Sequence, residues 1–474
     1  AGFDPGTEAP LVELWLKKGL LRHGARLLVL NPWQIELDKF GAQWIGYRPG
    51  SGLAVVQGLM RALVEAGAGS RLQRSLNLDE LRAGLERYRP EVVEGAAGIP
   101  AASLLAAARL LAEARQPIVL YGPNWLLTAS EEGRRREAEA IAVLENLALL
   151  LGGVEAAFVP RDNNAVGALQ MGAVPDLFPG QQPLADQKVR SRLASFWGAR
   201  LSPARGLTIE EMMAAGQQGS LKALWIMGSD PVRDCPGAAG SLERIPFVVV
   251  QDLFLTDTAR LADVVLPAAS FAEVDGTFTN LTGRVQAIRA ARYAPGEARP
   301  DWWILGEAAR RLAPPRGRGA WAFSSAGDVR AEMARVVPAW GDLNGPALDA
   351  GGWQLAAPPR AGRRAFVPVE AGLPARDDGG QLVLVPEPLL YDRGVLLSRS
   401  ERIQRVVPAP RVRMHPDDAR RLGLETGDQV SVSSAAGRWA GTLEASEQMA
   451  PGTATIAADA GDVPASALFD ACGV

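Results

Sequence analysis

Apolar residues in the first third of the chain recur in two alternating patterns. Residues 11–24, 52–65, 77–88, 100–114 and 134–151 place them at helical spacing. Residues 26–31, 43–47 and 117–122 are short apolar runs of strand length, bounded by turn residues. This alternation is typical of an α/β domain with a mostly parallel sheet, so we predict such a lobe over residues 1–158.

The first residues of this lobe look like a loop that follows a strand. Gly2, Phe3, Asp4 and Pro5 form a turn-like segment with no apolar run before it. An α/β unit does not normally start with such a loop. We therefore expect the lobe to lack its first strand, and residues upstream of Ala1 to be missing.

A second α/β pattern follows a turn-rich stretch. Residues 220–227, 246–251 and 261–267 read as short strands, and residues 301–312 have the spacing of an amphipathic helix that closes the unit. The pattern predicts a second α/β lobe over residues 159–320.

After residue 320 the residue composition and the apolar pattern of the chain change. Residues 321–378 are rich in Gly, Pro, Ala and Arg, which indicates a linker and irregular region with some helix around residues 328–337. Further on, short strand-like runs at 381–385, 429–433 and 453–457 surround a brief helix at 416–422. These features predict a small β-barrel over residues 379–474.

Composition narrows the class of protein. Among 474 residues, 47% are apolar and 22% charged, and 50 basic residues balance 53 acidic ones. This balance gives no reason to expect a nucleic-acid partner. The longest apolar runs are far shorter than the roughly 20 residues that cross a bilayer, so we expect no direct membrane insertion. No secretion signal is visible in the first residues, so a cytoplasmic location is the default expectation.

The residues most used in metal and hydrolytic chemistry are scarce. Cys235 and Cys472 are too few for an iron-sulphur cluster, which takes about four thiolates. His23 and His415 lack the spacing of metal ligands. We expect no metal site and no catalytic residue within this chain.

Three groups of segments carry a more specific signal. They are Asn163-Asn164 with Gly167, Met171-Gly172, Pro175-Asp176 and Pro179-Gly180; Met227 to Pro231 with Gln251 to Ala259; and Ala262 to Ala268 with Glu273, Gly276 to Asn280 and Gly283 to Gln286. In order and spacing they resemble the molybdopterin oxidoreductase superfamily over nearly the whole chain. The resemblance implies an α/β fold with two Rossmann-like parallel-sheet lobes and a C-terminal small β-barrel similar to the molybdopterin dinucleotide-binding domain.

Five residues in these segments are candidates for holding a cofactor: Gly228, Asp230, Gln251, Asp252 and Thr256. Loops at the carboxyl ends of parallel strands are where open α/β sheets bind ligands. A carboxylate there can accept hydrogen bonds from guanine or ribose, and a threonine can cap a helix or bind phosphate. The alternative is that these residues only cap helices and shape turns.

One segment directs the choice between branches of the superfamily. Leu389 to Gly394, with the sequence LLYDRG, resembles the large iron-sulphur subunit (the G-type subunit) of bacterial NADH:quinone oxidoreductase, or complex I. Active members carry a loop rich in small residues here, and Arg393 or Arg399 would intrude on a pterin. We therefore expect no cofactor in this fragment, with iron-sulphur clusters in the missing N-terminal part.

The resemblance to this large subunit implies a structural role in the peripheral arm of complex I. The fragment would support electron transfer from NADH through clusters held upstream and would contact other hydrophilic subunits. Its location would be cytoplasmic, at the inner face of the cell membrane. The alternative is a molybdenum or tungsten bis-pterin oxidoreductase such as formate dehydrogenase, in which the five candidate residues would bind molybdopterin guanine dinucleotide.

Overall fold

The chain divides into two units, one built mainly from residues 1–161 and 360–468 and the other from residues 162–359. The computed structural model describes the chain except for residues 69–76, 129–135, 155, 236, 314–320, 342, 344–347, 349–350, 356–364, 371, 373–381, 435, 459, 461–463 and 470–474. Cys472, Gln381 at the start of an expected strand, and Arg134 at the start of an expected helix lie outside the described residues. The domain boundaries expected at residues 158, 320 and 378 stay predictions.

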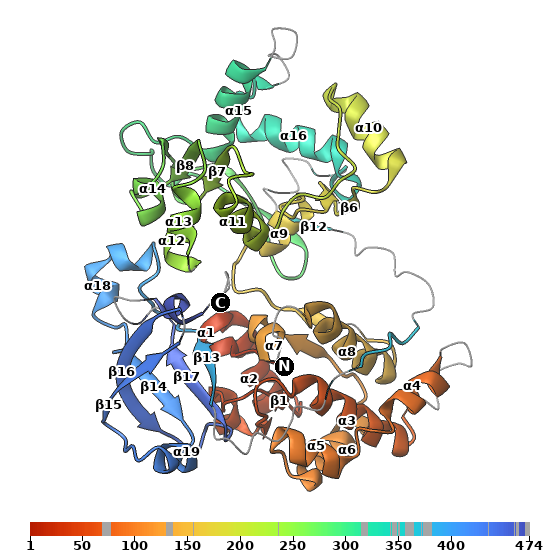
Figure 1. Cartoon of the computed structure of the whole chain (residues 1–474). Coiled ribbons are helices and arrows are strands. Elements are labelled where there is room, and N and C mark those ends of the chain that lie inside the picture. The colour runs from red at the N-terminus through yellow and green to blue at the C-terminus, as the bar shows by residue number, and fades with distance from the viewer. Residues whose placement is uncertain are drawn as a thin grey trace. The chain divides into compact units, whose positions relative to one another are not determined.

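The first unit opens with alternating helices and short parallel strands (Figure 1). Its helices are α1 (Pro5–Glu8), α2 (Pro10–Arg22), η1 (Glu36–Phe40), α3 (Gly52–Glu65), α4 (Leu78–Leu85), α5 (Pro90–Ala97), α6 (Ala101–Ala112), α7 (Pro123–Thr128) and α8 (Glu137–Leu150). Its strands are β1 (Leu28–Leu30), β2 (Gln43–Ile45), β3 (Val119–Tyr121) and β4 (Ala156–Phe158). β1 pairs with β2 and β3 with β4, both in parallel, which confirms the expected α/β class.

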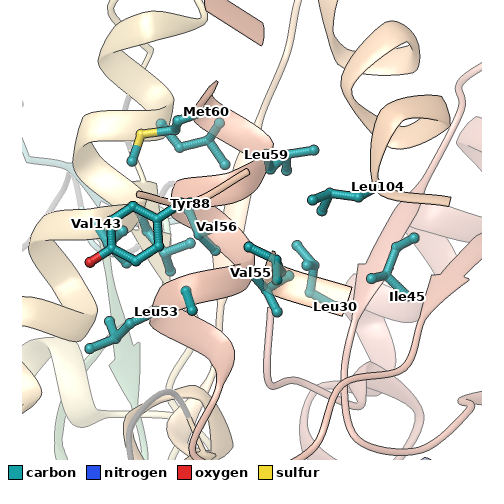
Figure 2. Packing of buried hydrophobic residues seen from close by; sticks show 14 of the residues in the cluster. Leu30, Ile45, Leu53, Val55, Val56, Leu59, Met60, Tyr88, Leu104 and Val143 are labelled. Carbon is teal, nitrogen blue, oxygen red and sulfur yellow. The ribbon is translucent and has the colours of Figure 1, made fainter. Parts of the chain in front are cut away.

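Helix α3 lies at the centre of this part. It is apolar on nearly every face, and Leu53, Val55, Val56 and Leu59 are almost completely buried. Figure 2 shows these side chains packed among residues of β1, β2, α6 and α8. Burying a Val or Leu side chain contributes roughly 1.5–3 kcal/mol, so this helix carries much of the stability of the unit.

Gly58 allows the neighbouring helices to pack closely on α3. A Cβ at this position would lie 2.8 Å from Cγ2 of Val93 and 3.0 Å from Cδ2 of Leu104. These two side chains come from α5 and α6. The glycine is therefore explained by helix packing and not by backbone conformation.

The same unit contains a mixed sheet from the C-terminal part of the chain, drawn in blue in Figure 1. Its strands are β13 (Val383–Glu387), β14 (Arg411–Met414), β15 (Gln429–Ser433), β16 (Arg438–Ala445) and β17 (Thr453–Ala457), in the order β13-β17-β14-β16-β15. The outer strands β13 and β15 do not pair with each other in the described part of the chain. Helices α18 (Glu401–Gln404) and α19 (Pro416–Arg421) accompany the sheet.

The second unit is built on a smaller parallel sheet. Its strands β7 (Leu224–Met227), β8 (Val248–Asp252) and β9 (Val264–Pro267) lie in that order, with β8 in the centre and buried along its whole length. The helices of this unit are α9 (Ala165–Gln170), α10 (Gln187–Trp197), α11 (Ile209–Gln217), α12 (Pro231–Asp234), α13 (Ala238–Leu242), α14 (Asp257–Arg260), α15 (Asp301–Leu312) and α16 (Ala326–Val336). The expected helix at 301–312 is thus confirmed.

Short antiparallel strands complete the second unit. They are β5 (Leu177–Phe178) with β6 (Gln182–Pro183), and β10 (Gly276–Thr279) with β11 (Arg284–Ile288) and β12 (Trp353–Gln354). The parallel strands expected at 220–227, 246–251 and 261–267 are each observed: β7 and β9 begin later than expected, and β8 begins and ends later than expected.

No single helix in the described part of the chain has the length and apolar character to cross a bilayer. One bent pair, α5 with α6, passes that test on length and composition together, with a 118° bend between its helices.

Candidate active-site edge of the second unit

The five candidate residues gather at one edge of the β7-β8-β9 sheet. Gly228 and Asp230 follow the end of β7, Gln251 and Asp252 are the last residues of β8, and Thr256 precedes α14. Because the strands are parallel, their carboxyl ends share this edge. That these residues bind a cofactor stays a prediction.

Asp230 connects the loop after β7 to the segment after β8 through hydrogen bonds. It is 5% exposed, and its Oδ1 accepts hydrogen bonds from the backbone N–H of Thr258 at 3.0 Å and from the Thr258 hydroxyl at 2.5 Å. The same hydroxyl oxygen accepts from the backbone N–H of Val232 at 3.0 Å. Asp230 therefore shapes the edge as well as lining it.

Asp252 turns the chain at the end of β8. Its Oδ1 accepts hydrogen bonds from the backbone N–H groups of Leu253 at 2.6 Å and Phe254 at 3.4 Å. Burial raises the pKa of its carboxyl group, and the nearby charges of Asp230 and Asp301 add to the rise, while the two backbone hydrogen bonds oppose it.

Gln251 and Thr256 use their polar groups within the protein. Gln251 is fully buried, its Nε2 donates to Oδ1 of Asp301 at 2.5 Å, and its Oε1 accepts from Nε1 of Trp225 at 3.2 Å. The Thr256 hydroxyl accepts from the backbone N–H of Ala259 at 3.1 Å and caps α14. For these two residues the contacts agree with the alternative interpretation, a structural role.

Sequence reasoning missed Asp301, the partner of Gln251. Its position at the start of α15 suggests only a favourable charge at a helix N-terminus. The contact joins residues separated by 50 positions, and nothing local in the sequence signals it.

Two of the three segment groups are also linked to each other. Oδ1 of Asn164 accepts from the backbone N–H of Thr279 at 2.9 Å. Asn280 accepts from Thr282 and Arg284 and so organises the turn between β10 and β11. These asparagines satisfy backbone groups, which agrees with a structural role.

Comparison with known families decides the family. The molybdopterin oxidoreductase family model matches residues 1–311, and the molybdopterin dinucleotide-binding domain model matches residues 394–472. The chain belongs to the molybdopterin oxidoreductase family. The fold agrees: acetylene hydratase from Pelobacter acetylenicus superposes with a TM-score of 0.70 over 95% of this chain and 69% of that protein, at 17% identity.

Three relatives whose names describe different oxidoreductases are about equally similar to this chain in sequence. The NADPH-Fe(3+) oxidoreductase subunit alpha of Geobacter sulfurreducens is 31% identical over 95% of this chain and 52% of its own length. The F420-dependent formate dehydrogenase 2 subunit alpha of Methanococcus maripaludis is 32% identical over 88% and 64%. A G-type subunit of the NADH-quinone oxidoreductase of Rhizobium meliloti is 31% identical over 95% and 51%. The chain thus spans about half to two thirds of these relatives.

The expectation that this fragment carries no cofactor is wrong. Both family models are those of molybdopterin proteins, and the second begins at residue 394, within the region in which a blocked pocket is inferred from sequence. That inference rests on the side chains of one loop. Arg161, which lies outside that loop, donates to the carbonyl oxygen of Leu389 at 3.1 Å and pairs with Asp392 at 3.0 Å. Leu389 and Asp392 of this loop therefore contribute to packing within the first unit.

The chemistry of the β7-β8-β9 edge fits a nucleotide-like group. Gly228 and Ser229 are exposed, Gly228 has a φ of +56°, and a Cβ there would meet nothing within 4 Å, so a ligand can approach the backbone closely. Among the described residues, Oδ2 of Asp230 and of Asp252 has no hydrogen-bond partner. Such oxygens can accept from a guanine or a ribose hydroxyl.

A second polar group lies inside the C-terminal sheet and has no counterpart among the sequence predictions. Glu387 accepts from Arg413 at 3.0 Å, from Arg411 at 3.3 Å and from the Thr455 hydroxyl at 3.0 Å, and Arg413 also pairs with Glu444 at 3.3 Å. The buried charges are paired with each other, which is what burial requires. This network holds β13, β14, β16 and β17 together.

Proposed function

We propose that this chain is the cofactor-holding part of a molybdopterin-dependent oxidoreductase, of the kind represented by formate dehydrogenases. The proposal rests mainly on two matches along one chain. The molybdopterin oxidoreductase model matches residues 1–311, and the molybdopterin dinucleotide-binding domain model matches residues 394–472. The formate dehydrogenase relative, aligned over 88% of the chain, gives further support.

In this proposal Gly228, Asp230 and Asp252 hold the nucleotide end of the cofactor. The glycine leaves room for the ligand at the backbone, and Oδ2 of Asp230 and of Asp252, for which the described residues supply no hydrogen-bond partner, accept hydrogen bonds from the ligand's polar edge. Gln251 and Thr256 position the two loops, through Asp301 and α14 respectively. When bound, the cofactor supplies a metal centre that exchanges electrons with the substrate.

The proposal is tested by metal and pterin analysis of the purified full-length protein that contains this chain. We expect stoichiometric molybdenum or tungsten with a pterin dinucleotide, and formate-dependent reduction of an artificial electron acceptor. Preparations from cells supplied with molybdate and tungstate that contain neither metal nor pterin would contradict it.

A pair of matched glycine variants tests the site itself. Gly228→Gln should lower the pterin content several-fold, because the side chain occupies the open space beside the loop. Gly219→Gln is the control, since Gly219 has a similar φ of +67°, has the same open space at its Cβ position, and precedes β7 at its other end. Equal pterin content in the two variants would argue against binding at this edge.

A second candidate is a role in an NADH:quinone oxidoreductase. It is supported by the relative from Rhizobium meliloti, aligned over 95% of the chain, and by the LLYDRG segment at 389–394. In that case the protein would assemble with other hydrophilic subunits at the inner face of the membrane. Co-purification of such subunits, with NADH-dependent and not formate-dependent reduction of quinone, would favour this candidate.

A further inference from the structure

Helix α2 carries a row of exposed apolar side chains on its outer side. Leu11, Leu14, Trp15 and Leu21 are between 58% and 70% exposed. Residues spaced by three, four and seven positions share one face of a helix, so these four form a stripe. Single exposed apolar residues are normal on a protein surface, whereas a stripe of them marks a surface that something else covers.

The opposite side of α2 is packed against the first unit. Leu16 and Leu20 contact the apolar cluster that contains Trp33 and Leu37. The helix is therefore already held on the unit by its inner side. The outer stripe has no part in that packing.

The exposed residues around the stripe include basic side chains and no acidic one. Lys18 and Arg22 are exposed. Glu13 is the one acidic residue between positions 10 and 26, and it is buried and pairs with Lys17 at 3.2 Å. In the described part of the chain, Lys18 and Arg22 have no ion-pair partner. The outer side of α2 is thus both apolar and positively charged.

A membrane surface rich in anionic lipid matches both properties. Helices that combine Leu and Trp with Lys and Arg lie along the boundary between headgroups and acyl chains. The long stems of Lys18 and Arg22 can reach lipid phosphates while the apolar side chains enter that boundary. A second copy of the chain fits less well, because a symmetric contact would bring the cations of both copies together without an exposed acid to pair with them.

We propose that α2 adsorbs to anionic lipid surfaces, with the apolar stripe at the acyl boundary and Lys18 and Arg22 on the headgroup phosphates. In this arrangement the helix lies along the surface and does not span the bilayer. The proposal does not depend on the proposed function, because neither a pterin nor a substrate takes part in the contact.

Flotation with lipid vesicles tests the role of charge. The purified protein that contains this chain should bind vesicles of phosphatidylcholine and phosphatidylglycerol in equal parts, less so at high salt, and should not bind vesicles of phosphatidylcholine alone. Lys18→Gln with Arg22→Gln should weaken binding roughly 25-fold, at about fivefold for each cation. The control, Lys188→Gln with Arg200→Gln, makes the same change of net charge at exposed positions of the second unit and should bind like the parent.

A second pair of variants tests the apolar stripe. Leu14→Gln with Trp15→Gln should weaken binding roughly tenfold or more. The control is Leu396→Gln with Val406→Gln, at side chains of the same unit that are 54% and 59% exposed. Lipid chains that carry bromine should quench part of the fluorescence of the bound parent. That part should be missing in Trp15→Phe, which should stay bound.

The proposal is overturned if the parent binds neither kind of vesicle, binds both equally, or binds as tightly after the α2 substitutions as before. It is also overturned if the stripe is already covered in the purified protein. Cover by a second copy would appear as a mass that halves in Leu14→Gln with Trp15→Gln, and cover by an acidic protein as a subunit that this variant releases. Pterin content is measured separately, so failure of this proposal is distinguished from failure of the proposed function.

Discussion

The Asp230 carboxylate joins the two loops of the candidate site through Thr258, accepting one hydrogen bond from its backbone N–H at 3.0 Å and another from its hydroxyl at 2.5 Å. The contact is almost completely buried. It fixes the position of the loop after β7 relative to the start of α14. The open backbone at Gly228 is presented on this fixed loop, so the contact orders the site.

Replacing Asp230 with alanine should therefore destabilise the second unit by roughly 2–3 kcal/mol, because it leaves a buried N–H and hydroxyl of Thr258 without an acceptor. The measurement is hydrogen exchange of β8 in increasing denaturant. If the β8 amides exchanged as slowly in Asp230→Ala as in the parent, Asp230 would not contribute this stability.

The matched control is Asp257→Ala, at the residue that precedes Thr258 in the chain. The Asp257 side chain is exposed, and its ion pair with Arg260, at 3.9 Å, is a surface contact. Its loss should change stability by less than about 1 kcal/mol. If Asp230→Ala were as stable as Asp257→Ala, the Asp230 carboxylate would not be the element that holds the two loops together.

Much of the fold follows from local patterns in the sequence. Helix α3 is predicted over residues 52–65 and observed as Gly52–Glu65, because its apolar spacing and the turn before it are both local signals. Helix α5 is not predicted. It has only eight residues and starts at Pro90, so its periodicity is too short to stand out.

The candidate site is only partly predictable. The apolar runs place Gly228 and Asp252 at strand ends, because strand position is a local property. The partners of Asp230 and Gln251 come from distant parts of the chain and leave no local pattern. The expectation about the cofactor fails because it relies on side chains at 389–394, whereas large cofactors are also bound through loop backbones.

Gly58→Ala should destabilise the first unit by roughly 1–3 kcal/mol, because its Cβ would crowd Val93 and Leu104 in a filled core. Gly95→Ala is the matched control. Gly95 is also helical, lies in α5, and has open space at the Cβ position, so alanine there should be neutral or stabilising by up to about 1 kcal/mol. Denaturant unfolding followed by hydrogen exchange of α3 measures both. A similar change in the two variants would refute the packing explanation.

Asn146 should hold the segment around Val367 against α8. Its Nδ2 donates to the carbonyl oxygen of Val367 at 2.7 Å, and its Oδ1 accepts from the N–H of Val367 at 2.9 Å. Asn146→Ala removes both bonds, and we expect the Val367 amide to exchange at least tenfold faster. Asn146→Asp keeps the acceptor and loses the donor, so its effect should be intermediate. Unchanged exchange in the alanine variant would show that the segment is held by other contacts.

The stability of the first unit should fall as the pH rises from about 4.5 to 7, because of Glu8. Burial raises the pKa of its carboxyl group from 4.5 to about 7, and the charge of Asp4 adds to the rise, while the hydrogen bond from the Asp4 N–H opposes it. The folded state therefore holds the proton more tightly than the unfolded chain does. The stabilisation is complete below the unfolded pKa and is lost as the pH passes through the folded value.

Glu8→Gln removes this titration and keeps an oxygen that can accept from Asp4. The variant should be more stable than the parent at pH 8 by roughly 1–3 kcal/mol, and about equal to it at pH 4.5. Glu91→Gln makes the same change of residue type at an exposed position of α5 and serves as the control. Exchange of the α3 amides, corrected for the intrinsic effect of pH, gives the measurement. If the parent and the Glu8→Gln variant lost the same amount of stability between pH 4.5 and pH 8, Glu8 would not be the titrating group.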